Sequence, residues 1–210
     1  MKTLIVAATR PEISLLIEHF KLPDGDFMLS DNFDVLITGV GMTATAFALG
    51  KHLSSKYALV LNLGIAGCFD YSLPLGTLIN IVKDQFSELG AENGQNFISI
   101  DELGFGKSTF EVQNKLTNSL ITDLVTGTGI TVNRVHGEEK SIQDIVKRLN
   151  PLTESMEGAA VLYCCANASI PCLQIRSISN YVELRNRNNW KIGLAINHLN
   201  QWAISFLTNP

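Results

Sequence analysis

Two stretches of the sequence decide the fold: Glu154-Ser155-Met156-Glu157-Gly158-Ala159-Ala160 and Gln174-Ile175-Arg176-Ser177-Ile178-Ser179-Asn180. In each stretch an apolar run carries a cluster of polar side chains, and a helix of small residues separates the two clusters. In α/β proteins, ligand chemistry lies at the carboxyl ends of the strands. We therefore expect both clusters at one edge of a sheet. There Glu157 offers a rigidly placed carboxylate, and Asn180 offers an amide that both donates and accepts hydrogen bonds.

The rest of the chain alternates apolar runs with helical segments. The apolar runs predict strands over residues 4–8, 35–38, 58–63, 76–82, 120–126 and 172–177, and the helical segments cover residues 12–20, 42–53, 138–149, 157–168 and 188–207. This alternation predicts a three-layer α/β/α fold with a central mixed sheet. No linker or repeat interrupts it, so we expect a single domain over residues 1–210. Residues 84–106 are polar and glycine-rich, which predicts an irregular, mobile or interface segment.

Composition and charge limit the classes of partner. Hydrophobic residues make up 46% of the 210 residues and charged residues 17%, so a large core is available and disorder is not expected. A net charge of −4 argues against a nucleic acid or an anionic membrane as partner. The apolar runs are too short to span a bilayer, and the cysteines form no C-x-x-C pair. We expect a soluble, cytoplasmic protein with reduced thiols.

A glycine-rich turn raises a dinucleotide alternative. Gly39-Val40-Gly41-Met42-Thr43-Ala44 fits G-x-G-x-x-A, but the next strand ends in Asn62-Leu63-Gly64, without the acidic residue that would hold a ribose. The turn is either a tight connection before a packed helix or a backbone pocket for a ribose or an anion. Glycines recur at the strand ends near residues 39–41, 64–67 and 127–129, which suggests one crevice for a flat ligand.

Five segments together resemble a known family. Residues 7–12, 39–41, 62–67, 156–160 and 176–180 are similar, in order, to the nucleoside phosphorylase/nucleosidase superfamily. They resemble in particular the nucleosidase branch that includes methylthioadenosine/adenosylhomocysteine nucleosidase. Within that branch, the stretch from Ser179 to Trp190 is similar to the futalosine hydrolases. The resemblance implies a nucleoside phosphorylase-like fold and hydrolysis of futalosine to release hypoxanthine in menaquinone biosynthesis. It also implies a homodimer or higher homo-oligomer.

The resemblance also implies the catalytic roles. Glu12 activates the attacking water, although by its position alone it could be a solvated carboxylate in the first turn of a helix. Glu157 accepts hydrogen bonds from the ribose hydroxyls, with Met156 against the sugar. Arg176 is a charge in an apolar strand, so we expect it to pair with a carboxylate near the water; a purely structural ion pair is the alternative. Neither a metal nor a cofactor is implied.

Asn180 departs from the adenine-cleaving relatives, which carry an aspartate there as a proton donor to purine N7. Asparagine cannot be that acid, but its carbonyl can accept from a protonated N7 while its NH2 donates to a 6-oxo group. Adenine presents a donor at position 6, and a mismatched buried polar group costs about 1–3 kcal/mol. Asn180 therefore favours a 6-oxopurine such as hypoxanthine, and a turn-capping asparagine is the alternative.

Other substrate-binding positions follow from the matched segments. Arg185 and Arg187 are candidates for binding the benzoate carboxylate of futalosine, unless both are solvated surface charges. Thr131 and Val132 fall in a loop that flanks the base in relatives, where adenine-cleaving enzymes carry an aromatic residue. Phe105 is expected to reach across a subunit boundary. The remaining expected substrate-binding residues are Ile65, Ala66, Gly67 and Ser179.

Three rival functions stay open at this point. The first is methylthioadenosine/adenosylhomocysteine nucleosidase activity. The second is a phosphorylase, which needs an arginine-bearing phosphate site; residues 39–45 and 62–69 have none, but Arg10 keeps it possible. The third is a non-catalytic nucleoside-binding sensor, against which the presence of Glu12, Glu157 and Arg176 argues.

Overall fold

A mixed sheet forms the centre of the protein in a computed structural model that describes residues 2–112, 116 and 118–208. The strand order is β10-β9-β5-β11-β4-β1-β3-β2, and β8 pairs with β5. The central strands are β1 (Lys2–Ala7), β3 (Phe33–Ile37), β4 (Tyr57–Cys68), β5 (Leu78–Phe86), β9 (Val125–Thr131) and β11 (Cys172–Tyr181). The shorter ones are β2 (Phe27–Leu29), β8 (Thr109–Glu111) and β10 (Thr153–Ser155).

The sheet contains both parallel and antiparallel strands, and five of its strands form a closed ring. β4 runs parallel to β1 and to β11, whereas β5 runs antiparallel to β11. β10 pairs in parallel with β9 and antiparallel with β4, so β10, β9, β5, β11 and β4 close on themselves. This closure brings β10 beside the carboxyl end of β4, where the polar clusters lie.

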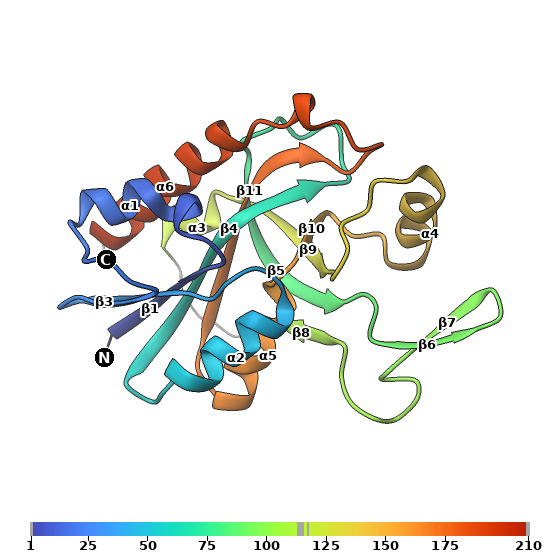
Figure 1. Ribbon diagram of the computed structural model, residues 1–210, viewed down its shortest axis with the longest axis horizontal. Coiled ribbons are helices and arrows are strands. Elements are labelled where there is room, and N and C mark those ends of the chain that lie inside the picture. The colour runs from blue at the N-terminus through green and yellow to red at the C-terminus, as the bar shows by residue number, and fades with distance from the viewer. Residues whose placement is uncertain (1, 113–115, 117, 209–210) are drawn as a thin grey trace.

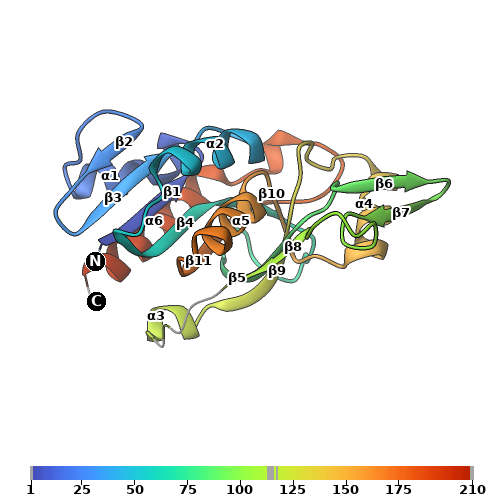
Figure 2. The same ribbon diagram turned by 90° about the horizontal axis from the view of Figure 1, so that it is seen from below.

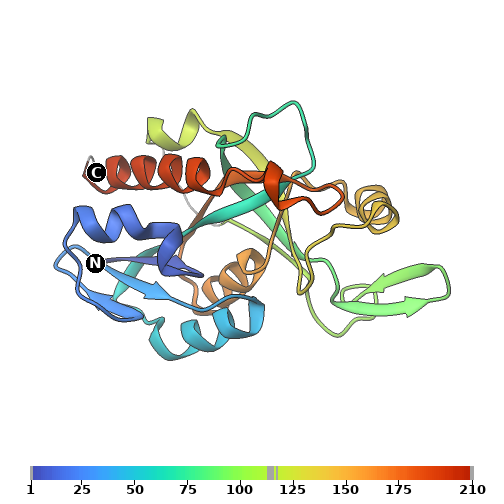
Figure 3. The ribbon, with the colours of Figure 1, turned by 45° about the horizontal axis from the view of Figure 1, so that its top comes forward.

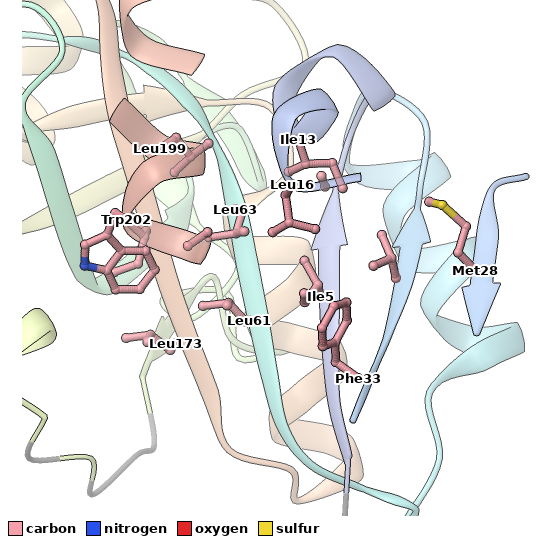
Figure 4. Close-up of a cluster of buried hydrophobic side chains, with 14 of the residues drawn as sticks. Ile5, Ile13, Leu16, Met28, Phe33, Leu61, Leu63, Leu173, Leu199 and Trp202 are labelled. Carbon is pink, nitrogen blue, oxygen red and sulfur yellow. The ribbon is translucent and has the colours of Figure 1, made fainter. Parts of the chain in front are cut away.

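Helices cover both faces of the sheet (Figures 1 and 3). The short helix η1 (Arg10–Ile13), α1 (Ser14–His19) and α6 (Ile192–Thr208) lie on one face, and α2 (Met42–His52) and α5 (Gly158–Ala168) lie on the other. Successive side chains of β1 point to opposite faces of the sheet, and this explains the two helix layers. Ile5 packs with Leu16 and Leu199 on one face. Leu4 packs with Leu49 and Val161 on the other. Figure 4 shows the hydrophobic cluster that contains Ile5, Leu16 and Leu199. The predicted three-layer mixed α/β fold is confirmed.

Two sequence predictions of secondary structure were wrong. Residues 120–126 were expected to form a strand, but α3 (Ser119–Thr122) comes first, capped by the Asn118 side chain accepting from Leu120 N at 2.8 Å. β9 begins only at Val125. Residues 84–106 were expected to be irregular, but they contain the end of β5 and a hairpin of β6 (Gly90–Asn93) and β7 (Asn96–Ser99). Figure 2 shows this hairpin projecting from the body of the protein.

The remaining helices end close to their predicted bounds. α4 spans Glu139–Leu149, and Glu138 caps it by accepting hydrogen bonds from the next turn. The expected helix over residues 188–207 is divided into η2 (Arg187–Asn189) and α6, because Trp190 adopts an extended conformation between them. Among the described residues, none of the helices has the length and apolarity needed to cross a bilayer.

Candidate active site

A cavity of about 380 Å³ lies at the carboxyl ends of β1, β4 and β11 and beside β10. Residues from both polar clusters of the sequence line it, together with the loop after β1. Its walls include Glu12, Met156, Glu157, Ser179 and Asn180. The structure therefore brings together the water-side, sugar-side and base-side candidates, as the sequence predicts.

The carboxylate of Glu12 is held on three sides. Its Oε2 accepts hydrogen bonds from the backbone N and the Oγ1 of Thr9, both at 2.9 Å, and its Oε1 accepts from Ile65 N at 3.2 Å. On α6, buried Asn200 donates to the Glu12 carbonyl at 2.8 Å and accepts from Leu16 N at 2.8 Å. The side chain is only 8% exposed, so it is a fixed acceptor at the cavity wall and not a solvated carboxylate.

Arg176 lies beneath Gly64, where a side chain would not fit. A Cβ on Gly64 would lie 1.9 Å from Arg176 Nη1 and 3.1 Å from Glu12 Oε1. Arg176 is 1% exposed, and its Nε and Nη2 have no hydrogen-bond partner among the described residues. The expected contact with a carboxylate is therefore not formed: within the described ranges, no ion pair includes Arg176. Arg176 is not part of the cavity wall, so these two nitrogens are buried behind it.

Glu157 stands at the start of α5 and faces the cavity. Its Oε1 accepts a hydrogen bond from Gly41 N at 2.9 Å, and Gly41 has a φ of +95° that favours glycine. The glycine turn after β3 therefore binds a carboxylate of the protein itself. Burial raises the pKa of Glu157, the charge of Arg176 and the Gly41 N–H lower it, and the charge of Glu12 raises it further. Glu157 is thus a desolvated acceptor suited to sugar hydroxyls.

Asn180 and Ser179 are neighbours on the cavity wall. Ser179 Oγ lies 2.7 Å from Asn180 Oδ1, and Asn180 Nδ2 donates to the Tyr181 carbonyl at 2.9 Å. These two contacts fix which way the amide faces. The second N–H of Nδ2 and the second lone pair of Oδ1 are then available to a ligand.

A buried polar network under α5 was not predicted from the sequence. Asp84 accepts from Thr131 Oγ1 at 2.9 Å and from Gln174 Nε2 at 2.7 Å, and Ala159 N donates to Thr131 Oγ1 at 2.7 Å. Burial raises the pKa of Asp84 to about 6, against hydrogen bonds and the Arg176 charge that lower it. The network links β5 to the first turn of α5, next to Glu157. A charged residue inside the apolar pattern of β5 is the signal that could have revealed it.

The other candidates divide between the cavity and the rest of the protein. Ile65, Ala66, Gly67 and Arg185 line the cavity. Thr131 and Val132 are fully buried, in the network and in the core respectively, and Phe105 is 81% exposed. Of the two arginines, Arg185 lies on the cavity with its guanidinium 5.0 Å from the ring of Trp190, which also lines it. Arg187 lies 5.7 Å from the same ring but is not part of the wall.

Two further cavity residues were not predicted from the sequence. His136 and Glu154 both line the wall, and they contact each other through Nδ1 and Oε2. Glu154 belongs to the first polar cluster, but the alternation along β10 could not show which of its carboxylates faces the ligand. His136 follows β9 in a loop, where only the fold brings it to Glu154.

Comparison with known proteins identifies the family of this chain. The family model of the phosphorylase superfamily matches residues 5–206. A futalosine hydrolase of Streptomyces coelicolor is 31% identical over 198 residues, which cover 90% of this chain and 79% of the relative. A futalosine hydrolase of Thermus thermophilus is 24% identical over 204 residues, which cover 93% of this chain and 91% of the relative.

Solved structures show the same fold. Futalosine hydrolase of Helicobacter pylori has a TM-score of 0.83 at 19% identity, with 100% of this chain and 98% of that one covered. A 5′-methylthioadenosine/S-adenosylhomocysteine nucleosidase of Colwellia psychrerythraea, in complex with adenine, has a TM-score of 0.82 at 22% identity, with coverages of 99% and 95%. Sequence and structure together show that this chain belongs to the phosphorylase superfamily and, within it, to the futalosine hydrolase family.

Proposed function

We propose that the protein hydrolyses the N-glycosidic bond of futalosine and releases hypoxanthine. The observation that carries this proposal is an amide, Asn180, fixed by its neighbours in the same cavity as two buried carboxylates, Glu12 and Glu157. Membership of the futalosine hydrolase family supports it independently.

The residues suggest a division of labour around the ribose. Glu12, anchored by Thr9 and Ile65, orients a water and accepts its proton as the oxygen attacks C1′. Glu157 accepts hydrogen bonds from the ribose hydroxyls, as a desolvated carboxylate held by Gly41. The C1′–N9 bond breaks with its electron pair leaving on the base. Asn180 stabilises the departing base by hydrogen bonds, and solvent supplies the N7 proton because an amide cannot release one.

The geometry of Asn180 supports a 6-oxopurine. Its free Oδ1 lone pair suits a protonated N7, and its free N–H suits the O6 acceptor of hypoxanthine. Adenine would set its own 6-amino donor against that N–H, and an unsatisfied buried group costs about 1–3 kcal/mol. This mismatch argues against a methylthioadenosine nucleosidase.

The position of Arg10 argues against a phosphorylase. Its Nη1 donates to the Gly25 carbonyl at 2.8 Å and its Nη2 pairs with Asp24 at 3.1 Å. Arg10 is not part of the cavity wall. The arginine that kept this rival open is therefore engaged by residues outside the cavity wall, which favours water as the nucleophile.

One assay tests the proposal. The protein is incubated with futalosine, methylthioadenosine and inosine, with and without phosphate, and the released bases are identified by chromatography. We expect hypoxanthine from futalosine at a rate that phosphate does not change. Adenine release from methylthioadenosine at a comparable rate, or turnover that requires phosphate, would contradict the proposal; binding without turnover would indicate a sensor.

The biological setting is part of the same proposal. Hydrolysis of futalosine places the protein in menaquinone biosynthesis. Among the described residues, Cys68, Cys164, Cys165 and Cys172 form no disulfide, which suits a reducing cytoplasm. Exposed Phe105 and Phe47 suit a homo-oligomer, and size-exclusion chromatography with light scattering measures that state.

A further inference from the structure

The floor of the cavity is a row of three residues across adjacent strands. Gly67 of β4 pairs with Glu154 of β10 on one side and with Asn180 of β11 on the other. All three line the cavity. A Cβ on Gly67 would lie 3.3 Å from Asn180 Nδ2 and 2.9 Å from the Val182 side chain, so the middle of the row is free of side chains. Two interstrand spacings, roughly 10 Å, separate the backbones that carry Glu154 and Asn180.

Glu154 fixes the orientation of a histidine at its end of this row. Glu154 Oε1 accepts from His136 N at 2.9 Å, and Glu154 Oε2 contacts His136 Nδ1. Glu154 is only 4% exposed, so this carboxylate is an acceptor with little access to solvent. A carboxylate beside Nδ1 places the proton of a neutral imidazole on that nitrogen. Nε2 is then an acceptor, and no residue in the described ranges donates to it.

We propose that His136, oriented by Glu154, is a specificity-determining residue that reads the N1 position of the purine. In this arrangement Nε2 accepts a hydrogen bond from the N1–H of hypoxanthine. Adenine has a lone pair at N1, which would face the lone pair of Nε2. Asn180 forms hydrogen bonds with N7 and O6 from one end of the row, and His136 forms one with N1 from the other end. This inference rests on the proposed function, because it assumes a 6-oxopurine in the cavity.

Binding of free bases tests the inference without turnover. Calorimetric titration compares hypoxanthine, 1-methylhypoxanthine, which lacks the N1–H, and adenine. We expect the unmodified protein to bind hypoxanthine roughly 5- to 100-fold more tightly than 1-methylhypoxanthine, the range for one buried hydrogen bond. His136→Phe should lose most of that ratio and should not weaken adenine binding. His136→Gln keeps an amide oxygen near the position of Nε2, so it should restore part of the ratio.

Matched controls separate recognition from folding. His198 is also partly buried and also held through Nδ1, by the Gly76 carbonyl at 2.8 Å, but it lies outside this cavity. His198→Gln should leave the base ratio unchanged. In ¹⁵N NMR spectra of the unmodified protein, hypoxanthine should shift the Nε2 resonance of His136, and 1-methylhypoxanthine should not.

Two results would overturn the inference. One is an unchanged ratio of hypoxanthine to 1-methylhypoxanthine in His136→Phe, and the other is equal weakening of all three bases, which marks a structural role. A failure of the proposed function looks different, because the unmodified protein would then release no hypoxanthine from futalosine or would prefer adenine.

Discussion

Glu12 Oε1 accepts a hydrogen bond from the backbone N–H of Ile65 at 3.2 Å, so the carboxylate of η1 is attached to β4. The bond joins segments 53 residues apart and leaves the carboxylate on the cavity wall. Because a backbone N–H is the donor, the position of Glu12 depends on the strand and not on a mobile side chain. This anchoring makes Glu12 a suitable base for a water.

Replacing this carboxylate should stop hydrolysis while leaving binding largely intact. In Glu12→Gln the amide can still accept one hydrogen bond, but it cannot take the proton of the attacking water. We expect kcat to fall by about 10²- to 10⁴-fold, with the Kd for futalosine within several-fold of the original. The matched control is Glu18→Gln, an exposed glutamate of α1, which should keep full activity. Equal kcat values in the two variants would show that Glu12 is not the base.

Adding one methyl group at Gly64 should displace Arg176. The new Cβ would lie 1.9 Å from the guanidinium, so Gly64→Ala must move a fully buried charge. We expect a lower melting temperature and a loss of activity of at least about tenfold. Gly50→Ala in α2 has no atom within 4 Å of its Cβ and should be neutral or slightly stabilising. Full activity in Gly64→Ala would mean that the position of Arg176 does not matter.

Asp84 should make the protein less stable as the pH rises. Its pKa is about 6 in the folded protein and 3.8 when unperturbed, so folding is coupled to proton binding between these values. The ionised, buried form opposes folding fully above about pH 6 and not at all below about pH 4. Between those limits the free energy of unfolding should fall by on the order of 3 kcal/mol.

Urea denaturation at pH 4 and pH 7 measures the Asp84 contribution. Asp84→Asn cannot ionise, so the unfolding free energy at pH 4 minus that at pH 7 should be smaller by about that amount than in the unmodified protein. Asp31→Asn, at an exposed aspartate, is the control and should leave the difference unchanged. If Asp84→Asn retains the full pH dependence, another group is responsible for it.

An aspartate at position 180 should shift the preference toward adenine. Asn180→Asp removes the N–H that suits O6 and introduces a group that can accept from a 6-amino donor. We expect the ratio of kcat/KM for the 6-oxo substrate over its 6-amino analogue to fall by roughly tenfold or more. Competition between the two substrates in one reaction, followed by chromatography of the released bases, gives the ratio directly. An unchanged ratio would remove Asn180 from base recognition.

The two arginines after β11 should behave differently. Arg185 lines the cavity and Arg187 does not, so only Arg185 is placed to bind a carboxylate of the substrate. Arg185→Ala should raise KM for futalosine by roughly tenfold and leave KM for inosine, which has no carboxylate, nearly unchanged. Arg187→Ala is the internal control. Equal effects of Arg185→Ala on both substrates would indicate a general role in the shape of the cavity.

The sequence predicted the main elements because their patterns are local. Strands such as β1 and β4 are continuous apolar runs, and α4 and α5 begin and end at recognisable residues. Three-residue strands such as β2, β8 and β10 are too short to show a period, so they were not predicted. The helical turn of α3 depends on a side-chain cap at Asn118, which an apolar run does not reveal.

Part of the candidate site could likewise be predicted from the sequence, and part could not. Glu12 and Asn180 meet in the cavity because both lie at the carboxyl ends of strands that run parallel to β4, namely β1 and β11. Glu157 reaches the same cavity from β10, which runs antiparallel to β4. The contact between His136 and Glu154 could not be foreseen, because it depends on how β10 closes against β4. The expected pairing of Arg176 was wrong, because the sequence cannot show whether a buried charge meets a partner within hydrogen-bond distance.

The course of β4 has a consequence for how the family can diversify. Gly64 and Ile65 lie beside Glu12, and Gly67 pairs with Asn180, all on one continuous strand. Their separation is set by the rise of an extended chain, about 10 Å over three residues. Loop insertions cannot stretch this interval. New substrates can therefore be accommodated by exchanging side chains beside Gly64 or Gly67, but not by increasing the distance between these two positions.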